Sequence, residues 1–195
     1  MSHDDETLRV YATRTADYAK FAQIEDPHLA TFIARLKPGA QVLDLGCGPG
    51  HAAAAMADAG LHPAATDAVA EMVALAARHP GVTARQMTFD QIAGEDLYDG
   101  IWANFSLLHA ARADLPRHLS ALHRALRPGG AFHIGMKTGT GTQRDAIGRR
   151  YTYVTEAELR GLLADAGFTV TAATTGRDKG LDGTYADWIT LAAYG

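Results

Sequence analysis

The sequence predicts an α/β protein built on an open, doubly wound sheet of seven mostly parallel strands, with a C-terminal antiparallel hairpin and helices on both faces. A glycine-rich turn joins an apolar run to a run of helix-forming residues in VLDLGCGPGHAAAAM, residues 42–56. Helical and strand-like patterns alternate after this turn, and two alternating runs close the chain. Because crossovers between parallel strands are right-handed, this alternation places helices on both faces of one sheet.

Helices are expected before the first strand. Residues 8–22 carry Tyr11, Tyr18 and several small residues at helical spacing. Pro27 begins a second helical stretch, which ends before Gly39. An N-terminal helical segment is therefore predicted over residues 1–38.

The middle of the chain predicts the parallel part of the sheet. Its expected order is strand 42–45, helix 51–59, strand 61–66, helix 69–78, strand 82–87, strand 98–103, helix 114–126 and strand 131–136. The last of these helices has leucines at helical spacing and stops at the sequence RPGG. Five strands result.

The last third of the chain predicts a loop, a helix and a hairpin. Residues 138–150 are rich in glycine and arginine, which indicates an irregular loop. Thr155 and Glu158 have the spacing of a capping box at the start of a helix. The runs 168–175 and 187–195 alternate on either side of a glycine-rich link, which predicts a hairpin at one edge of the sheet and brings the total to seven strands.

Composition and charge limit the kinds of partner. A chain of 195 residues, 47% of them hydrophobic, is long enough for one domain with a sizeable core. Its net charge of −4 gives no attraction to nucleic acid, so a small molecule is the expected partner. Cys47 is the only cysteine, and we expect neither a disulfide nor a metal site. With no apolar run long enough to span a membrane and no export signal at the N-terminus, the expected state is a cytoplasmic monomer or homodimer.

The glycine turn is the expected ligand site. In doubly wound sheets, ligands bind outside the carboxyl ends of the strands, where the strand order reverses. Gly46, Gly48 and Gly50 allow positive φ and close approach of a ligand to the backbone, although a purely structural turn is the alternative. A dinucleotide fingerprint requires glycine or alanine where His51 stands, which disfavours a nicotinamide oxidoreductase.

Asp67 supplies a second feature of a nucleoside site. It lies 21 positions after Gly46, at the end of the next predicted strand. At this spacing a carboxylate can accept hydrogen bonds from both ribose hydroxyls. The alternative is that Asp67 caps the helix that starts near Val69, and the two roles are compatible.

The sequence VLDLGCGPG resembles the first motif of class I S-adenosylmethionine-dependent methyltransferases, because an acid precedes the first glycine by two residues. The resemblance implies a Rossmann-like fold, S-adenosyl-L-methionine as cofactor and S-adenosyl-L-homocysteine as product. It also implies that Asp67 binds ribose, that Asp44 orders water or the amino group at the methionyl end, and that Met72 covers the adenine.

Further stretches, from about residue 40 to the end, resemble a small bacterial branch of these enzymes that includes tellurite-resistance-like methyltransferases. The N-terminal sequence YATRTADY also fits this branch, whose members fold a preceding helix over the cofactor. The helices within residues 1–38 are then expected to cover the cofactor, with Tyr11, Arg14 and Tyr18 near the methionyl carboxylate. Ordinary helix packing is the alternative for both tyrosines.

The adenine contact after the third strand is less regular. The family often places an acid there, whereas this chain has Thr88 at that place and Asp90 two residues later. Phe89, with its backbone groups and its ring against the adenine, is the preferred candidate. Asp90 is then a solvated loop residue.

The segment ANFSLLHA, after the fourth strand, is expected to line the reaction centre by the same resemblance. His109 is the candidate general base, with a structural histidine as the alternative. Asn104 is expected to hold the acceptor or the cofactor backbone, or else to cap the loop. The segment lacks the Asn/Asp-Pro-Pro-aromatic motif of the branches that methylate amino groups of bases or of glutamine.

Residues 137–153 are the candidate substrate lid. Lys137, Arg149 and Tyr151 are the expected substrate-binding residues, in a segment that also carries Arg144 and Arg150. A substrate with an acidic group would explain this basic cluster, and a solvated face paired with Asp145 is the alternative. The predicted function is methyl transfer to a small molecule by one domain of residues 1–195, with a non-catalytic cofactor-binding protein as the rival.

Overall fold

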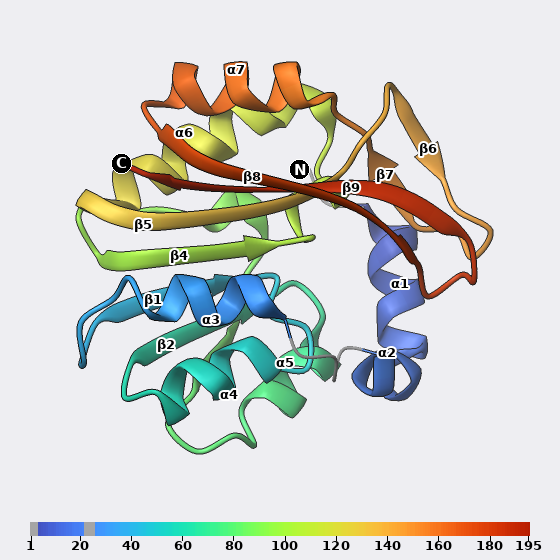
Figure 1. Ribbon diagram of the computed structural model, residues 1–195. Coiled ribbons are helices and arrows are strands. Elements are labelled where there is room, and N and C mark those ends of the chain that lie inside the picture. The colour runs from blue at the N-terminus through green and yellow to red at the C-terminus, as the bar shows by residue number, and fades with distance from the viewer. Residues whose placement is uncertain (1–3, 22–25) are drawn as a thin grey trace.

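The computed structural model describes residues 4–21 and 26–195 and confirms the predicted fold class (Figure 1). Its sheet has seven strands, and a short ribbon adds two more: β1 (Gln41–Leu45), β2 (His62–Asp67), β3 (Thr83–Gln86), β4 (Tyr98–Asn104), β5 (Leu126–Lys137), β6 (Thr142–Arg144), β7 (Arg150–Thr152), β8 (Thr169–Lys179) and β9 (Tyr185–Tyr194). The order in the sheet is β3-β2-β1-β4-β5-β9-β8. The strands from β3 to β5 are parallel, and β9 pairs antiparallel with both β5 and β8.

The order of the strands reverses at β1. Val42 lies opposite Pro63 of β2 on one side and Gly100 of β4 on the other. The chain thus leaves β1 for β2 and β3, and later returns to the opposite side of β1 with β4. This is the switch point at which ligands bind in doubly wound sheets.

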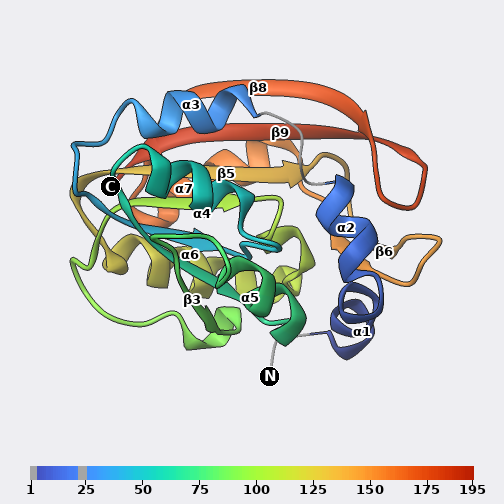
Figure 2. The ribbon, with the colours of Figure 1, turned by 90° about the horizontal axis from the view of Figure 1, so that it is seen from below.

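Helices cover both faces of the sheet: α3 (Pro27–Ile33), α4 (His51–Asp58) and α5 (Ala70–Ala76) lie on one face, and α6 (Leu115–Ala125) and α7 (Glu156–Ala166) on the other (Figure 2). The period of two along β1 decides which side chain meets which helix. Val42 packs with Phe32 and Met56, whereas Leu43 belongs to the core cluster that contains Leu122.

The predicted helix over residues 8–22 is instead two helices, α1 (Asp5–Thr13) and α2 (Thr15–Phe21), and residue 22 lies outside the described residues. The hydroxyls of Thr13 and Thr15 donate hydrogen bonds to carbonyls of the preceding turn, Arg9 at 2.9 Å and Tyr11 at 2.8 Å. Such back-bonding bends helices. Both helices lie beside the carboxyl ends of the parallel strands (Figures 1 and 2).

The prediction of an irregular loop over residues 138–150 is wrong for part of that segment. Thr142 pairs with Thr152 and Arg144 with Arg150, which forms the antiparallel β6–β7 ribbon beside α1 (Figure 1). Asp145 stabilises the turn of this ribbon, because its Oδ1 accepts hydrogen bonds from the amides of residues 147 and 149. These side-chain contacts are not visible in the glycine and arginine content.

The predicted capping box at α7 is only half formed. Thr155 Oγ1 accepts a hydrogen bond from the amide of Glu158 at 3.1 Å. The carboxylate of Glu158 pairs instead with Arg112, in the 3₁₀ turn Arg112–Asp114. Among the described helices, none is both long and apolar enough to cross a membrane.

Candidate cofactor site

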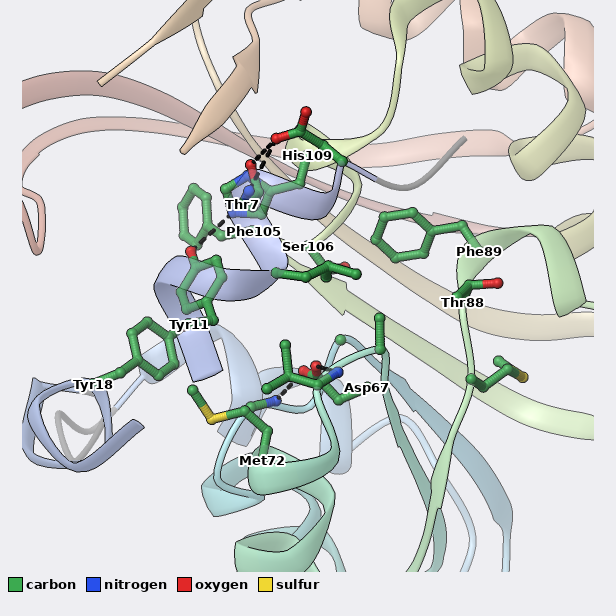
Figure 3. A pocket seen from close by; sticks show the side chains of 17 residues that line it. Thr7, Tyr11, Tyr18, Asp67, Met72, Thr88, Phe89, Phe105, Ser106 and His109 are labelled. Atoms are coloured by element: carbon green, nitrogen blue, oxygen red, sulfur yellow. Dashed lines mark hydrogen bonds between the residues drawn. The ribbon is translucent and has the colours of Figure 1, made fainter. Parts of the chain in front are cut away.

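A cavity lies at the carboxyl ends of β1 to β4, beneath α1 and α2 (Figure 3). The open space within it, including the solvent at its mouth, is about 760 Å³. Its walls are formed by Asp4, Thr7, Leu8, Tyr11, Tyr18, Gly46, Gly48, Asp67, Ala68, Val69, Met72, Met87, Thr88, Phe89, Phe105, Ser106 and His109.

The glycine turn forms the floor of the cavity. Gly46 and Gly48 have φ angles of +70° and +53°, which favour glycine. A Cβ on Gly46 would collide with Ser106, and a Cβ on Gly48 would lie 3.0 Å from the ring of Tyr18. The turn therefore admits close neighbours only because it carries no side chains there.

Gly50 has a different place from the other two glycines. It does not line the cavity, and a Cβ on it would lie 2.7 Å from the backbone of Ala76 in α5. Its φ of +87° begins α4. The contacts of Gly50 thus concern the packing of two helices, and its predicted contact with the cofactor stays a prediction.

Asp67 joins the end of β2 to the glycine turn. One carboxylate oxygen accepts a hydrogen bond from the amide of Gly48 and the other from the amide of Val69, both at 2.9 Å. Burial raises the pKa of Asp67, while these amides oppose the shift. Since each oxygen accepts more than one hydrogen bond, the capping role leaves acceptor capacity toward the cavity, where Asp67 lies (Figure 3).

Asp44, in β1 two residues before Gly46, has only 2% of its surface exposed and does not line the cavity. Its Oδ2 has no hydrogen-bond partner among the residues that the structure describes. Burial, with a further contribution from the negative charge of Asp67, raises the pKa of Asp44 to about 7. A buried carboxylate oxygen without a donor is costly, and a ligand with a cationic donor would satisfy it.

The residues that follow β3 were predicted to contact the adenine, and two of them form a wall of the cavity. Thr88 and Phe89 line the cavity, and Met72 of α5 lies opposite them (Figure 3). Phe89 begins the 3₁₀ turn Phe89–Gln91. Asp90 does not line the cavity, and its carboxylate pairs with Arg117 at 2.6 Å.

His109 ends the 3₁₀ turn Leu107–His109 and is held on both ring nitrogens. Nδ1 lies 2.7 Å from the carbonyl oxygen of Arg150, which only accepts, so Nδ1 carries the hydrogen. Nε2 then accepts the hydroxyl of Tyr11 at 2.9 Å. Burial, followed by the positive charges of Arg149 and Lys137, lowers the pKa of His109 to about 3. The imidazole is thus neutral, and its lone pair is already engaged.

The N-terminal residues divide into two groups. Tyr11 and Tyr18 line the cavity, and their rings meet edge to face at 5.2 Å between centroids. Arg14 is exposed at the end of α1 and does not line the cavity. The structure therefore brings two of these three predicted residues to the site.

None of the three predicted substrate-binding residues lines the cavity. Arg149 is buried behind Tyr11: it pairs with Asp145 at 2.7 Å and donates to the Tyr11 hydroxyl at 3.0 Å. The Nζ of Lys137 lies 3.8 Å from the centroid of the Tyr151 ring. The alternative for the basic cluster was a solvated face paired with Asp145. Arg149 does pair with Asp145, but the pair is not solvated, because the two side chains are only 3% and 5% exposed.

Asn104 is held by residues outside the cavity. Its amide nitrogen donates to Asp26 at 3.0 Å, and its amide oxygen lies 3.0 Å from Nε2 of His133. These contacts resemble the predicted loop cap more than a ligand contact, and a role toward acceptor or cofactor stays a prediction.

Sequence reasoning missed several residues of the wall. Thr7 and Leu8 come from α1, where nothing in the sequence distinguishes the face that meets the cavity. Phe105 and Ser106 lie within the segment ANFSLLHA, which was expected to line the site, yet neither was singled out. Phe105 has a φ of +53°, unusual for a residue other than glycine and invisible in the sequence.

Comparisons with known proteins agree with this geometry. Residues 42–130 match a family model described as a methyltransferase domain. An uncharacterized methyltransferase of Synechocystis sp. is 32% identical over 105 residues, which are 51% of this chain and 48% of that protein. The chain thus spans about half the length of this curated relative.

Two solved structures share the fold. One is 1,6-didemethyltoxoflavin-N1-methyltransferase of Burkholderia thailandensis with bound 1,6-didemethyltoxoflavin and S-adenosylhomocysteine, at a TM-score of 0.78 and 26% identity over 97% of this chain and 87% of that one. The other is an S-adenosylmethionine-dependent methyltransferase of Methanosarcina mazei, at a TM-score of 0.74 and 18% identity over 87% and 97% of the two chains. With the family match and the Rossmann-like sheet, these findings make the chain similar to class I S-adenosylmethionine-dependent methyltransferases.

Proposed function

We propose that this chain binds S-adenosyl-L-methionine in the cavity above the glycine turn and transfers its methyl group to an uncharged small molecule. One observation carries the proposal: the Asp67 carboxylate lines the cavity and accepts a hydrogen bond from the Gly48 amide of the glycine turn, while the buried Oδ2 of Asp44, two residues before Gly46, has no partner among the described residues. A ligand with a ribose would give Asp67 its donors, and a cationic amino group on the same ligand would be favoured by the negative charge of Asp44.

The residues present fit this cofactor. Asp67 would accept from the ribose hydroxyls, and Met72 and Phe89 would enclose the base. The methionyl end would then lie over Gly46 and Gly48, under the rings of Tyr11 and Tyr18. The N-terminal helices act as the cover in this arrangement, within one methyltransferase domain over residues 1–195.

When bound, the cofactor supplies a methyl group on positively charged sulfur, which is already activated toward a nucleophile. The chain then has to orient the acceptor and exclude water. Tyr11, Phe105 and Leu8 give the cavity wide apolar walls that favour exclusion of water. His109 acts as a positioning residue for Tyr11, because its lone pair already accepts the Tyr11 hydroxyl.

The charges around the cavity favour an acceptor without net charge. Among the described residues, its walls contain the acids Asp4 and Asp67 but neither lysine nor arginine. An acidic acceptor would have to lose its hydration without a cationic partner from the protein, at a cost of several kcal/mol. Arg144 and Arg149 are paired with Asp4 and Asp145, so the basic cluster of residues 137–153 does not support the expected acidic group.

The Burkholderia methyltransferase has 1,6-didemethyltoxoflavin, a small molecule, bound in its structure. This supports a small-molecule acceptor here as well. Membership of the tellurite-resistance-like branch, and the role of residues 137–153 as a substrate lid, stay predictions. In the structure this segment contacts the start of α1, since Arg144 pairs with Asp4 at 2.8 Å.

Isothermal titration with S-adenosylhomocysteine tests the cofactor site. We expect binding by the wild-type protein and at least tenfold weaker binding by Asp67→Ala, about 1.4 kcal/mol. Asp90→Ala is the matched control, because Asp90 lies outside the cavity walls. Absence of heat with S-adenosylhomocysteine, or binding of NADH in its place, would refute the site.

Transfer of labelled methyl from S-adenosylmethionine to a pool of cell metabolites tests the activity. Labelled, uncharged small molecules are the expected products. Tight binding of S-adenosylhomocysteine without transfer to any metabolite would instead favour the rival, a cofactor-binding protein without catalysis.

A further inference from the structure

Ser106 has a buried hydroxyl that no described residue uses. The residue is 5% exposed and lines the cavity, where Figure 3 shows it between the N-terminal helices and the end of β2. Its Oγ has no hydrogen-bond partner among the described residues. Leaving a buried hydroxyl unsatisfied costs about 1–3 kcal/mol, so a partner from outside the chain is expected.

The backbone around Ser106 fixes the position of this hydroxyl. Phe105 adopts a φ of +53°, and its amide donates to the carbonyl of Gly135 in β5 at 3.0 Å. The carbonyl of Ser106 accepts from the amide of His109 at 3.1 Å, which closes the following turn. Such strain, held by surrounding hydrogen bonds, is a feature of binding and active sites.

A second buried oxygen without a partner belongs to a residue that is close to Gly46 in the sequence. Asp44 precedes this glycine by two residues in β1, and its Oδ2 has no partner among the described residues. Ser106 packs directly on Gly46, whose missing Cβ leaves the space for it. The two residues with an unsatisfied oxygen are thus both neighbours of Gly46, Ser106 by packing and Asp44 by sequence.

The order of the strands tells which part of a ligand reaches these oxygens. Thr88 follows β3, Asp67 ends β2, Gly46 follows β1 and Ser106 follows β4, in the order in which these strands lie in the sheet. A ligand whose base lies near Thr88 and whose sugar lies at Asp67 extends its remaining part over Gly46 toward Ser106.

We propose that Ser106 binds the amino-acid end of S-adenosylmethionine, with its Oγ accepting a hydrogen bond from the α-ammonium group. The inference rests on the proposed cofactor and adds a residue to its site. An ammonium group has three donors, and hydrogen bonds from a charged donor are stronger than neutral ones. Ser106 would accept a hydrogen bond from one of these donors.

A pair of ligands that differ in the amino-acid part tests this role. S-adenosylhomocysteine carries the ammonium group, whereas 5′-methylthioadenosine keeps the nucleoside and the sulfur without it. We expect Ser106→Ala to weaken S-adenosylhomocysteine binding about tenfold and to change 5′-methylthioadenosine binding less than twofold, by isothermal titration. Ser120→Ala, on α6 outside the cavity walls, is the matched control and should change neither.

Equal weakening of both ligands by Ser106→Ala, or no weakening of either, would overturn the role of Ser106 while leaving the cofactor site intact. If the wild-type protein binds neither ligand, the proposed function itself fails. Thermal unfolding reports whether the variants fold. Should Ser106→Ala not fold, Ser106→Cys, which keeps the size of the side chain and only a weak acceptor, is expected to show the same selective loss.

Discussion

The hydroxyl of Tyr11 donates a hydrogen bond to Nε2 of His109 at 2.9 Å, across a sequence separation of 98 residues. The same hydroxyl accepts from Arg149, and the other ring nitrogen of His109 donates to the carbonyl of Arg150. The first helix is thereby tied through one histidine to the segment after β4 and to the β6–β7 ribbon. This fixes the cover of the cavity and the charge state of the imidazole.

His109 is expected to stay neutral from pH 8 down to pH 5, because burial and its neighbouring cations lower its pKa to about 3. Long-range ¹H–¹⁵N NMR of the imidazoles should show the Nδ1–H form over this whole range. In concentrated urea, the signals of all nine histidines should titrate near the unperturbed pKa of about 6.5. A midpoint for His109 between pH 5.5 and 7.5 in the folded protein would contradict the neutral state.

Asp44 is expected to make the ligand-free protein less stable as the pH rises. Its pKa is raised to about 7 in the folded state, against an ordinary value of 3.8. Between these values the folded state holds the extra proton, so this contribution to the free energy of unfolding decreases with rising pH and is lowest above pH 7. Asp44→Asn removes the effect.

Urea unfolding at pH 5 and pH 8 checks this. The stability of Asp44→Asn relative to wild type should rise from pH 5 to pH 8 by about 1 kcal/mol or more. The same variant should weaken S-adenosylhomocysteine binding, since an amide oxygen replaces a carboxylate. A stability difference that does not change with pH would show that Asp44 has an ordinary pKa.

Gly50→Ala is expected to destabilise the fold more than Gly60→Ala. Both glycines have positive φ, +87° and +81°. A Cβ on Gly50 would lie 2.7 Å from the backbone of Ala76, whereas nothing lies within 4 Å of a Cβ on Gly60. Urea unfolding should show a cost of about 1 kcal/mol for Gly60→Ala and a further 1–3 kcal/mol or so for Gly50→Ala. Equal costs would show that α5 moves aside freely.

Arg149→Met is expected to destabilise the protein by about 3–5 kcal/mol, because it leaves Asp145 buried without its cation. The side chains of this pair are only 3% and 5% exposed. Arg160→Met is the control, since the Arg160–Glu156 pair is exposed and such pairs contribute about 0.5 kcal/mol or less. Denaturant unfolding measures both. A small effect of Arg149→Met would show that the pair is not desolvated.

Much of the fold follows from local features of the sequence. The period of two in the apolar strands, the glycines after β1 and the proline that starts α3 each act within a few residues, and the structure has the elements they predict. Asp67 was found in the same way, because the length of one βα unit fixes its distance from Gly46. The edge hairpin of β8 and β9 also follows from two alternating runs around one turn.

The rest of the site was decided by contacts between distant residues. Arg149 reads as a surface arginine in the sequence, yet the structure buries it between Asp145 and Tyr11, 138 residues away. Likewise, no local feature of the sequence shows that Ser106 packs on Gly46 or that His109 Nε2 accepts a hydrogen bond from Tyr11. The same holds for the ribbon that residues 142–152 form beside α1.

The sequence by itself determined the strands, the glycine turn and the acids that follow it, because backbone conformation and side-chain periodicity are properties of neighbouring residues. Only the tertiary structure decided which polar groups are satisfied and which are left for a ligand. Burial and hydrogen bonding depend on segments that meet only when the sheet is complete, and these set both the neutral state of His109 and the unsatisfied oxygens of Asp44 and Ser106.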